Sequence, residues 1–563
     1  MIRRPAVFHS ALLAALIMTF LVASAQVRAY TGNVRRDAFT LQGPIPAPVV
    51  RYMPPASARV PVVAVIAHGY SANKEIMSAF AVDLAKQGVT VYTFDFPGHG
   101  ASTAFYGGTD HSHVVQQLVS SLGEVVDYAT AHAAPKTKVV LLGYSLGTIA
   151  VGEYALQHPN MANLQATILV AGILNDKPTL KTPRNLLVLT GQFDLPGIND
   201  IARNSIAAAC GATASSIHGA LYQCKVSATN QRKRIILPGL DHISIVTAAS
   251  THDAVIQWLG ATVDPRIGKT PVNADVRLHW MLVGFLAALL AVAPLIKLLA
   301  LGFRLRPAQG QAIAAISAPG ASPASQPSGD PTGLPRLLGF GALAATLGAA
   351  LLGLRAALPS SFWAPDPFPF TFLRQQVSAD VAIFFLFAGA LITAAIWGIR
   401  RVRAFIRLPQ WWREAAPQAL IAVVVTAFLS VTLGALSSYA WESLTLEPQR
   451  LWRGAAYAIM IWPFFFGLRS LLHAMAPRLK HPALADLGAS LLIIASLVGA
   501  IVMNFGRLSY LGILLPIVAI MLLLLAAASA WIRRTVAHPV ALISVLEALL
   551  LAWILSATLP LVA

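Results

Sequence analysis

The sequence predicts two structurally different regions: a mostly parallel sheet covered by helices on both faces, followed by an all-α membrane region. Only 11% of the 563 residues are charged, whereas an ordinary soluble domain has about 25%. Polar residues gather between about Tyr30 and Val276, and long apolar stretches follow one another after His279. Part of the chain must therefore face a medium other than water.

The N-terminal segment, residues 1–29, has the features of an export signal. Arg3 and Arg4 precede an apolar stretch, and Ala23-Ser24-Ala25 follows as an A-x-A cleavage site. An uncleaved signal anchor would have the same features, so both interpretations stay open. In either case the two arginines remain inside and the domain that follows, residues 30–276, is exported.

Within residues 30–276, short apolar runs alternate with helix-like runs. Short, wholly apolar strands that alternate with helices are typical of a parallel sheet buried on both faces. The expected strands are Pro61–Ala67, Thr90–Phe94, Lys138–Gly143, Thr167–Ala171, Asn185–Thr190 and Arg234–Leu237. The expected helices lie near Lys74–Gln87, Ser112–His132 and Leu146–His158.

The region after this domain predicts about eight membrane spans, each close to the roughly 20 residues that cross a bilayer. They are His279–Leu301, Leu337–Leu358, Val377–Ile399, Gln418–Tyr439, Leu451–His473, Leu484–Phe505, Tyr510–Ile532 and Val540–Leu561. We expect one transmembrane helix in residues 277–302 and about seven in residues 336–563. Between them, residues 303–335 are rich in Ala, Pro, Ser and Gly, a composition that predicts a flexible linker.

The net charge of +18 follows the predicted membrane topology. Every basic cluster falls in a loop on the same side as the N-terminus, which is the pattern of inward-facing loops. These clusters contain Arg304, Arg306, Arg400, Arg401, Arg403, Arg407, Arg413, Arg478, Lys480, Arg533 and Arg534. The distribution disfavours a nucleic-acid partner. It predicts a multi-pass protein of a bacterial inner membrane, with the N-terminal domain on the outer side.

The stretch Gly143-Tyr144-Ser145-Leu146-Gly147 matches the pattern G-x-S-x-G between an expected strand and an expected helix. In this setting the serine occupies a strained turn, so its neighbours must be glycine to avoid a clash. The turn holds Ser145 Oγ where a substrate can reach it. Ser145 is therefore the candidate nucleophile.

A serine hydroxyl needs a base to take its proton, and the base needs an acid to orient it. His242 lies in a glycine-containing loop after the last expected strand, whereas His132, His158 and His218 have surface positions. The acid is expected to be Asp194, which follows the preceding strand. Asp241 adjoins His242 and cannot easily reach around to the same ring, and the weaker rivals for the acid are Asp176 and Asp200.

An oxyanion that forms during acyl transfer needs backbone N–H donors. Leu146, directly after the nucleophile, supplies one candidate donor. The turn His68-Gly69-Tyr70 follows an early strand and supplies the other, the N–H of Tyr70. His68 itself is interpreted as a structural turn residue and not as a second base.

Together, the motifs AHGYSANKE, DFPGHGAS, GYSLG, LTGQFD and GLDHISI resemble the α/β-hydrolase superfamily. The resemblance covers about Ala47 to Leu259 and is nearest to serine esterases, monoglyceride-lipase-like and serine-aminopeptidase-like members. It implies the α/β-hydrolase fold and a Ser145-Asp194-His242 triad. It also implies that the loop Asp95–Ser102 is structural.

Two departures from the resemblance concern the cover of the site. Only about 14 residues separate Ala171 from Asn185, too few for the helical lid of many relatives. In exchange, the stretch from Asp194 to His242 is long and contains Cys210 and Cys224, the two cysteines of the chain. We expect an insertion that overhangs the site and is pinned by a disulfide in an oxidising compartment.

Other motifs add little. Polar residues near the predicted spans are expected to be solvated at span ends, with Glu547 the most embedded. The others are Asp380, Glu442, Asp486 and Asn504. The sequence has no His/Cys cluster with metal-ligand spacing, phosphate-binding glycine loop or dinucleotide fingerprint, so we expect neither cofactor nor metal.

These observations predict a membrane-anchored serine hydrolase whose partners are the lipid bilayer and a small-molecule or lipid ester. An amide or a thioester is the less favoured substrate for the same chemistry. An acyltransferase with the same triad is an alternative, since another hydroxyl could replace water. A transporter or scaffold with a hydrolase-like binding domain is the alternative from a different class. An aspartate would stand at Ser145 in haloalkane dehalogenases and epoxide hydrolases, so both chemistries are disfavoured.

Overall fold

The computed structural model describes residues 3–562 apart from 108–110, 173, 175, 196, 270, 272–274, 306–333, 359–372, 399–407, 440–443 and 476–481. The chain divides into two compact units. One contains residues 20–285, 433–445 and 558–563, and the other contains residues 1–19, 286–432 and 446–557. We call them the sheet unit and the helical unit. The predicted linker lies almost entirely outside the described residues, and Glu442 lies outside them as well.

The sheet unit is built on a nine-stranded sheet with strand order β1-β2-β4-β3-β5-β6-β7-β9-β8. The six strands from β4 to β9 in this order are parallel, whereas β1, β2 and β8 pair antiparallel. The strands are β1 Arg35–Leu41, β2 Ala47–Met53, β3 Val62–Ala67, β4 Thr90–Phe94, β5 Lys138–Tyr144, β6 Leu164–Val170, β7 Leu186–Phe193, β8 Leu221–Ser227 and β9 Asn230–Asp241.

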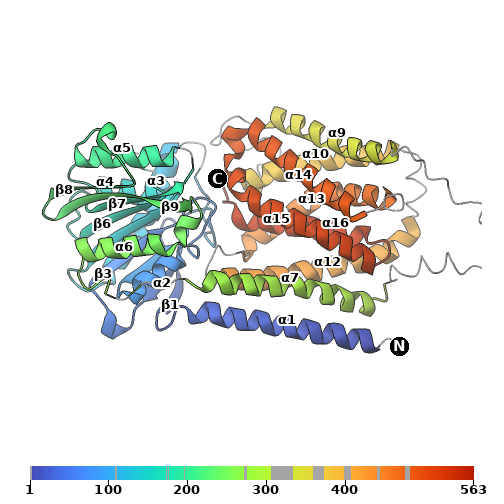
Figure 1. The fold of residues 1–563 in the computed structure, drawn as a ribbon, viewed down its shortest axis with the longest axis horizontal. Coiled ribbons are helices and arrows are strands. Elements are labelled where there is room, and N and C mark those ends of the chain that lie inside the picture. Colours follow the sequence, from blue (N-terminus) through green and yellow to red (C-terminus); the bar gives the residue numbers. More distant parts are fainter. Residues whose placement is uncertain are drawn as a thin grey trace, which may run out of the picture. The chain divides into compact units, whose positions relative to one another are not determined.

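Helices cover both faces of this sheet (Figure 1). One face carries α2 (Ser78–Lys86), which contacts α6 (Ala249–Thr262), and the other carries α3 (His111–Ala131), which contacts α4 (Leu146–Gln157). All six residues of β3 are buried as a result. A helix α5, Ile198–Cys210, packs on β7, β8 and β9. The predicted fold class, a mostly parallel sheet covered by helices and followed by apolar helices, is confirmed.

The prediction missed β1, β2, β8, α5 and α6, and the reason is clearest for the strands. β1 and β8 lie at the edges of the sheet, where half of each strand faces solvent and the sequence lacks a continuous apolar run. β2 contains Pro48 and Arg51. A search for continuous apolar runs therefore passes over the edge strands β1 and β8, and the proline and arginine interrupt such a run in β2.

Outside the sheet unit's core the chain is helical. The long helices are α1 Arg3–Ala29, α7 Arg277–Gly302, α9 Leu334–Ala357, α10 Gln376–Gly398, α12 Leu408–Ser437, α13 Pro448–Met475, α14 Pro482–Met503, α15 Phe505–Thr535 and α16 Val540–Thr558. Among the described residues, eight helices are long and apolar enough to cross a membrane, α1 included. The remaining predicted span corresponds to α9, whose apolar part is the shorter stretch Leu343–Ala356.

The α1 helix continues through the A-x-A sequence that could be cleaved. Within the sheet unit, Val27 is buried in a cluster with Met281 and Leu436. Ala23 is also fully buried. A signal peptidase site at Ala23–Ala25 would therefore be helical in this structure, with Ala23 buried and Ala25 exposed.

The expectation that the polar residues near span ends are solvated is wrong for three of them. Asp380 and Asp486 have no exposed surface, and Asn504 is only 5% exposed. Asp486 is buried because arginines of two neighbouring helices, Arg469 and Arg533, reach its carboxylate. Counting residues from a span end cannot show such partners.

Candidate active site

Ser145 occupies a sharp turn between β5 and α4. Its backbone has φ 50° and ψ −116°, a strained conformation for a residue other than glycine. The flanking glycines leave no room for a side chain. A Cβ on Gly143 would lie 2.3 Å from the Gly147 carbonyl oxygen, and one on Gly147 would lie 2.4 Å from that of Ala67. The G-x-S-x-G pattern is thus the steric condition for this turn.

The structure brings together Ser145, His242 and Asp194. Ser145 Oγ lies 3.0 Å from His242 Nε2, and His242 Nδ1 lies 2.6 Å from Asp194 Oδ1. The Asp194 carboxylate is fully buried, and the imidazole is 9% exposed. With Nδ1 protonated and bonded to the carboxylate, Nε2 is free to accept the proton of the serine hydroxyl.

The ends of β7 and β9 position the acid and the base. A Cβ on Gly191 would lie 2.4 Å from the Leu240 carbonyl oxygen, so glycine allows the two strands to approach closely here. The register of the pair shifts between Gly191 and Phe193, and such a bulge redirects the following side chain. The Asp194 carboxylate accepts hydrogen bonds from the N–H groups of Gly191 (3.3 Å) and Leu195 (2.8 Å), which fix its orientation.

The rival acids have other roles. Asp241 Oδ1 accepts hydrogen bonds from the N–H groups of Ser244 and Ile243, and these bonds hold the pKa of its carboxyl below the usual value. Asp241 therefore closes the turn that carries His242. Asp200 is exposed and pairs with Arg203 at 2.6 Å, and Asp176 is exposed as well.

The predicted oxyanion turn lies directly beside the nucleophile. A Cβ on Gly69 would lie 3.1 Å from Ser145 Cβ, so the backbone that leads to Tyr70 passes next to the serine. Leu146 is the first residue of α4, where backbone N–H groups have no partner within the helix. Both N–H donors therefore come from backbone that adjoins Ser145.

His68 joins two loops and does not contact the triad. Its Nδ1 lies 2.7 Å from the Gly69 carbonyl oxygen, to which it donates, and its Nε2 accepts a 3.1 Å hydrogen bond from the Phe96 N–H. This pattern requires the neutral imidazole. Complete burial lowers the pKa of His68 to about 4. The structural interpretation of His68 agrees with this geometry.

A buried ion pair supports the same loop. Asp95 accepts hydrogen bonds from Lys74 Nζ (2.6 Å), the Lys74 N–H (2.8 Å) and the Ala101 N–H (2.9 Å). Burial opposes the charge on Lys74, but the Asp95 and Glu75 carboxylates outweigh it and raise the pKa of the ammonium. A Cβ on Gly100 would lie 2.5 Å from the Asp95 carboxylate, which explains this glycine of the GHG sequence.

Sequence reasoning missed Tyr144, the residue before the nucleophile. Its hydroxyl donates a 2.9 Å hydrogen bond to the His242 carbonyl oxygen, and its ring lies 5.5 Å from the imidazole, centroid to centroid. A Cβ on Gly69 would lie 3.0 Å from the Tyr144 ring. Tyr144 therefore contacts both the base and the oxyanion turn. Its place inside the motif is the signal that could have identified it.

A second missed feature is the segment after α16, which belongs to the sheet unit. The Leu561 N–H donates to the Gly98 carbonyl oxygen, and the Tyr106 N–H donates to the Leu561 carbonyl oxygen, each at 2.8 Å. The Tyr106 ring packs on Tyr70 and His99, with centroids 5.9 and 5.3 Å away. The segment thus supports the chain between Gly98 and Tyr106, and the Tyr106 ring in turn packs against Tyr70 of the oxyanion turn. Nothing in its sequence indicates this role.

The insertion between Asp194 and His242 is partly built into the sheet. Its cysteines, Cys210 at the end of α5 and Cys224 in β8, form a disulfide. β8 pairs with β9 and extends the sheet at its edge, which differs from the expected overhanging cover. Phe193, Leu195 and Ile201 nonetheless expose apolar side chains around the strand end that carries Asp194.

The described residues contain no group of three or more His, Cys, Asp or Glu side chains that could hold a metal ion. His132 and His218 are exposed, and His158 is exposed at the end of α4. The groups that the geometry brings together are the serine, the imidazole, the carboxylate and the backbone donors. This arrangement can transfer an acyl group through the serine oxygen.

Part of the chain is similar to known hydrolases. Residues 59–196 match the model of a hydrolase family described as serine aminopeptidase, S33. A stretch of 107 residues is 31% identical to a pimeloyl-[acyl-carrier protein] methyl ester esterase of Proteus mirabilis (strain HI4320), covering 19% of this chain and 35% of the relative. The chain thus spans about a third of the length of this curated relative.

A solved structure is also similar to the chain. It is the crystal structure of a predicted CIB-like hydrolase from Thermoplasma acidophilum, with 15% identity and a TM-score of 0.30. The match covers 41% of this chain and 99% of that one. The family match and the strand order together give the sheet unit the α/β-hydrolase fold.

Proposed function

We propose that this chain is a membrane-anchored serine hydrolase that cleaves an ester through Ser145, His242 and Asp194. The observation that carries the proposal is the line of two contacts from Ser145 Oγ through the imidazole to Asp194, at 3.0 and 2.6 Å. Its geometry is that of a hydroxyl, a base and an orienting acid. A domain that only binds would need none of the three in contact.

In the proposed reaction, Ser145 Oγ attacks the ester carbonyl carbon while its proton passes to His242 Nε2. The Asp194 carboxylate stabilises the imidazolium, and the N–H groups of Tyr70 and Leu146 stabilise the oxyanion. The C–O bond then breaks, and the leaving alkoxide takes the proton from Nε2. Water repeats the sequence on the acyl-enzyme, giving a carboxylic acid and free Ser145.

Four observations support the location and substrate class within this proposal. The long apolar helices fit a multi-pass membrane protein, and the basic clusters favour a bacterial inner membrane with the sheet unit outside. The Cys210–Cys224 disulfide fits an oxidising outer compartment. The P. mirabilis relative is named as a methyl ester esterase, which favours an ester over an amide. A catalytic domain in the same chain as membrane helices suits a lipid or other apolar ester.

The decisive experiment is labelling of the detergent-solubilised full chain with a fluorophosphonate probe. We expect labelling of the wild-type chain, and of the exposed-serine control Ser215→Ala, but none of Ser145→Ala. Ester hydrolysis should fall at least about 10⁴-fold in Ser145→Ala. Folded wild-type protein that the probe does not label would reject the hydrolase in favour of a binding domain.

Substrate class is tested on the same preparation with a series of esters of increasing acyl length. Product analysis with and without an added alcohol separates hydrolysis from acyl transfer. An ester formed from the alcohol in preference to the acid would replace hydrolase by acyltransferase.

A further inference from the structure

The helical unit contains a buried cluster of four charged side chains, one from each of four helices. Arg469 of α13 donates to Glu547 of α16 through two nitrogens, with Nε–Oε2 at 2.8 Å, and to Asp486 of α14 at 2.5 Å. Arg533 of α15 donates to the same Asp486 oxygen at 2.6 Å. Arg469, Asp486 and Glu547 are at most 3% exposed. Two cations and two carboxylates leave this cluster electrically balanced.

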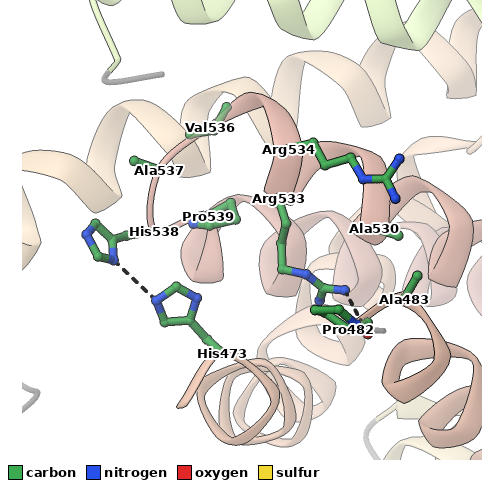
Figure 2. A pocket seen from close by; sticks show the side chains of 10 residues that line it. All are labelled: His473, Pro482, Ala483, Ala530, Arg533, Arg534, Val536, Ala537, His538 and Pro539. Carbon is green, nitrogen blue, oxygen red and sulfur yellow. Dashed lines mark hydrogen bonds between the residues drawn. The ribbon is translucent and has the colours of Figure 1, made fainter. Parts of the chain in front are cut away.

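A cavity of about 290 Å³ adjoins the cluster where α13 and α15 end and α14 and α16 begin. The lining residues are His473, Pro482, Ala483, Ala530, Arg533, Arg534, Val536, Ala537, His538 and Pro539. Figure 2 shows His473 and His538 facing each other, and Arg533 reaching toward Pro482. The two imidazole nitrogens lie 3.2 Å apart. None of the ten lining residues is acidic.

The charged side chains that line the cavity are two arginines, Arg533 and Arg534. Arg533 is shared between the cluster and the cavity wall, and Asp486 fixes its guanidinium. Asp486 and the Pro482 carbonyl oxygen engage three of its five N–H donors, so two remain for a further acceptor. Arg534 adds a second arginine to the lining, and the paired imidazoles add ring nitrogens that can donate to an oxygen anion. Two helices begin here and two end here, so the helix dipoles oppose one another and the side chains decide which charge the cavity accepts.

The size and the rest of the lining define the anion. A cavity of 290 Å³ is at the lower limit for small-molecule sites, so it accepts a headgroup-sized anion and not a whole lipid. Arginine recognises phosphate through paired N–H donors, and basic pockets between transmembrane helices bind acidic headgroups. Pro482, Val536 and Pro539 give the cavity an apolar side that suits the carbon skeleton of such a group.

We propose that this cavity binds the phosphate group of an acidic phospholipid headgroup. The predicted topology puts this end of the helices on the inner side, where the bound lipid would belong to the inner leaflet. The proposal concerns the helical unit alone and does not depend on any activity of Ser145. Inorganic phosphate has the same recognition chemistry, so the test has to separate the two sources.

The test measures the thermal midpoint of the detergent-solubilised full chain against three probes. These are dioctanoyl-phosphatidylglycerol, inorganic phosphate, and dioctanoylglycerol, which has the same acyl chains without phosphate. We expect a rise with phosphatidylglycerol and none with dioctanoylglycerol. A rise with inorganic phosphate alone would assign the site to free phosphate. Equal rises with both lipids, or no rise with either phosphate-bearing probe, would overturn the proposal.

Variants locate the binding. Arg534→Gln/His538→Gln changes two exposed lining residues and leaves the buried cluster intact, so the chain should still fold. Its apparent dissociation constant for phosphatidylglycerol should rise about tenfold, because the contact from a charged guanidinium and the contact from an imidazole are both removed. Arg355→Gln, an exposed arginine on α9, is the matched control and should behave as wild type. An unchanged dissociation constant in the double variant would place the lipid elsewhere and overturn the proposal.

Discussion

The sheet unit and the helical unit both bury carboxylates beside basic groups, but they connect them differently. In the sheet unit, Asp194 contacts one imidazole, and the line continues to the half-buried hydroxyl of Ser145. In the helical unit, Asp486 and Glu547 both contact Arg469, and Asp486 also contacts Arg533. The first arrangement is a line with an open end, whereas the second is closed and charge-balanced.

The difference determines what each arrangement can do. Imidazole has a pKa near neutrality, so a proton can enter and leave the open line during a reaction. Arginine stays protonated, so a closed Arg–carboxylate cluster holds its charge and fixes the helices that supply it. Replacing one residue of the Ser145–His242–Asp194 line should therefore lower the rate of hydrolysis. Replacing one residue of the arginine–carboxylate cluster should lower the stability of the fold.

The largest expected effect is that of Asp194→Asn. The amide cannot hold the Nδ1–H tautomer, so kcat should fall about 10⁴-fold. The thermal midpoint should stay within a few degrees of wild type, because the amide oxygen can still accept one of the two hydrogen bonds that Gly191 and Leu195 donate to different carboxylate oxygens. Hydrolysis rates of the full chain test the expected loss of kcat, and thermal scans test the expected stability. The exposed Asp200→Asn is the control, and a wild-type rate for Asp194→Asn would remove the acid from the mechanism.

Arg469→Met should have the next largest effect, and on stability. It leaves Glu547 buried without its arginine, which costs about 3–5 kcal/mol for a broken buried pair. We expect a lower thermal midpoint and less monodisperse protein in detergent. The double variant Arg469→Met/Glu547→Leu removes both charges and should recover most of the loss. No recovery would show that the arginine acts through contacts other than the ion pair.

The two regions also differ in how far they could be predicted from the sequence. Ser145 was identifiable because steric demands at Gly143 and Gly147 act within five consecutive residues. Asp194 and His242 each follow an apolar strand, so the parallel sheet brings them to one edge. The pairing of Asp486 with Arg469 and Arg533 depends on how three helices pack. Hydropathy shows that helices exist but not which faces meet.

Contacts between distant segments escaped prediction for the same reason. Leu561 lies more than 400 residues from Gly98, and its hydrogen bonds to the loop use only backbone atoms. Tyr144 was visible inside the motif, but its partner is a carbonyl oxygen 98 residues away. The strands at the sheet edges were missed because their side chains alternate between core and solvent.

The third prediction concerns how stability depends on pH through His68, the buried histidine of the oxyanion turn. The pKa of His68 falls from 6.5 to about 4 because of burial. As pH decreases below 6.5, the unfolded chain binds a proton that the folded chain excludes. Stability is therefore complete above about pH 6.5 and decreases toward pH 4, by on the order of 3 kcal/mol.

The measurement compares thermal midpoints of wild type and His68→Gln between pH 7 and pH 4. Other groups titrate in both proteins, so the difference between the two pH profiles isolates His68. We expect His68→Gln to be less stable at pH 7 and to lose less stability on acidification. Parallel profiles would mean that His68 is not excluded from protonation in the folded chain.

The smallest expected effect is that of Tyr144→Phe, which separates positioning of the base from packing. The variant keeps the ring against Gly69 and removes only the 2.9 Å hydrogen bond to the His242 carbonyl oxygen. A net loss of about 1 kcal/mol would lower kcat about fivefold and leave KM unchanged. Tyr222→Phe on β8 is the control. A kcat equal to wild type would restrict Tyr144 to packing, whereas a change in KM alone would place its effect on substrate binding beside Gly69 and not on the base.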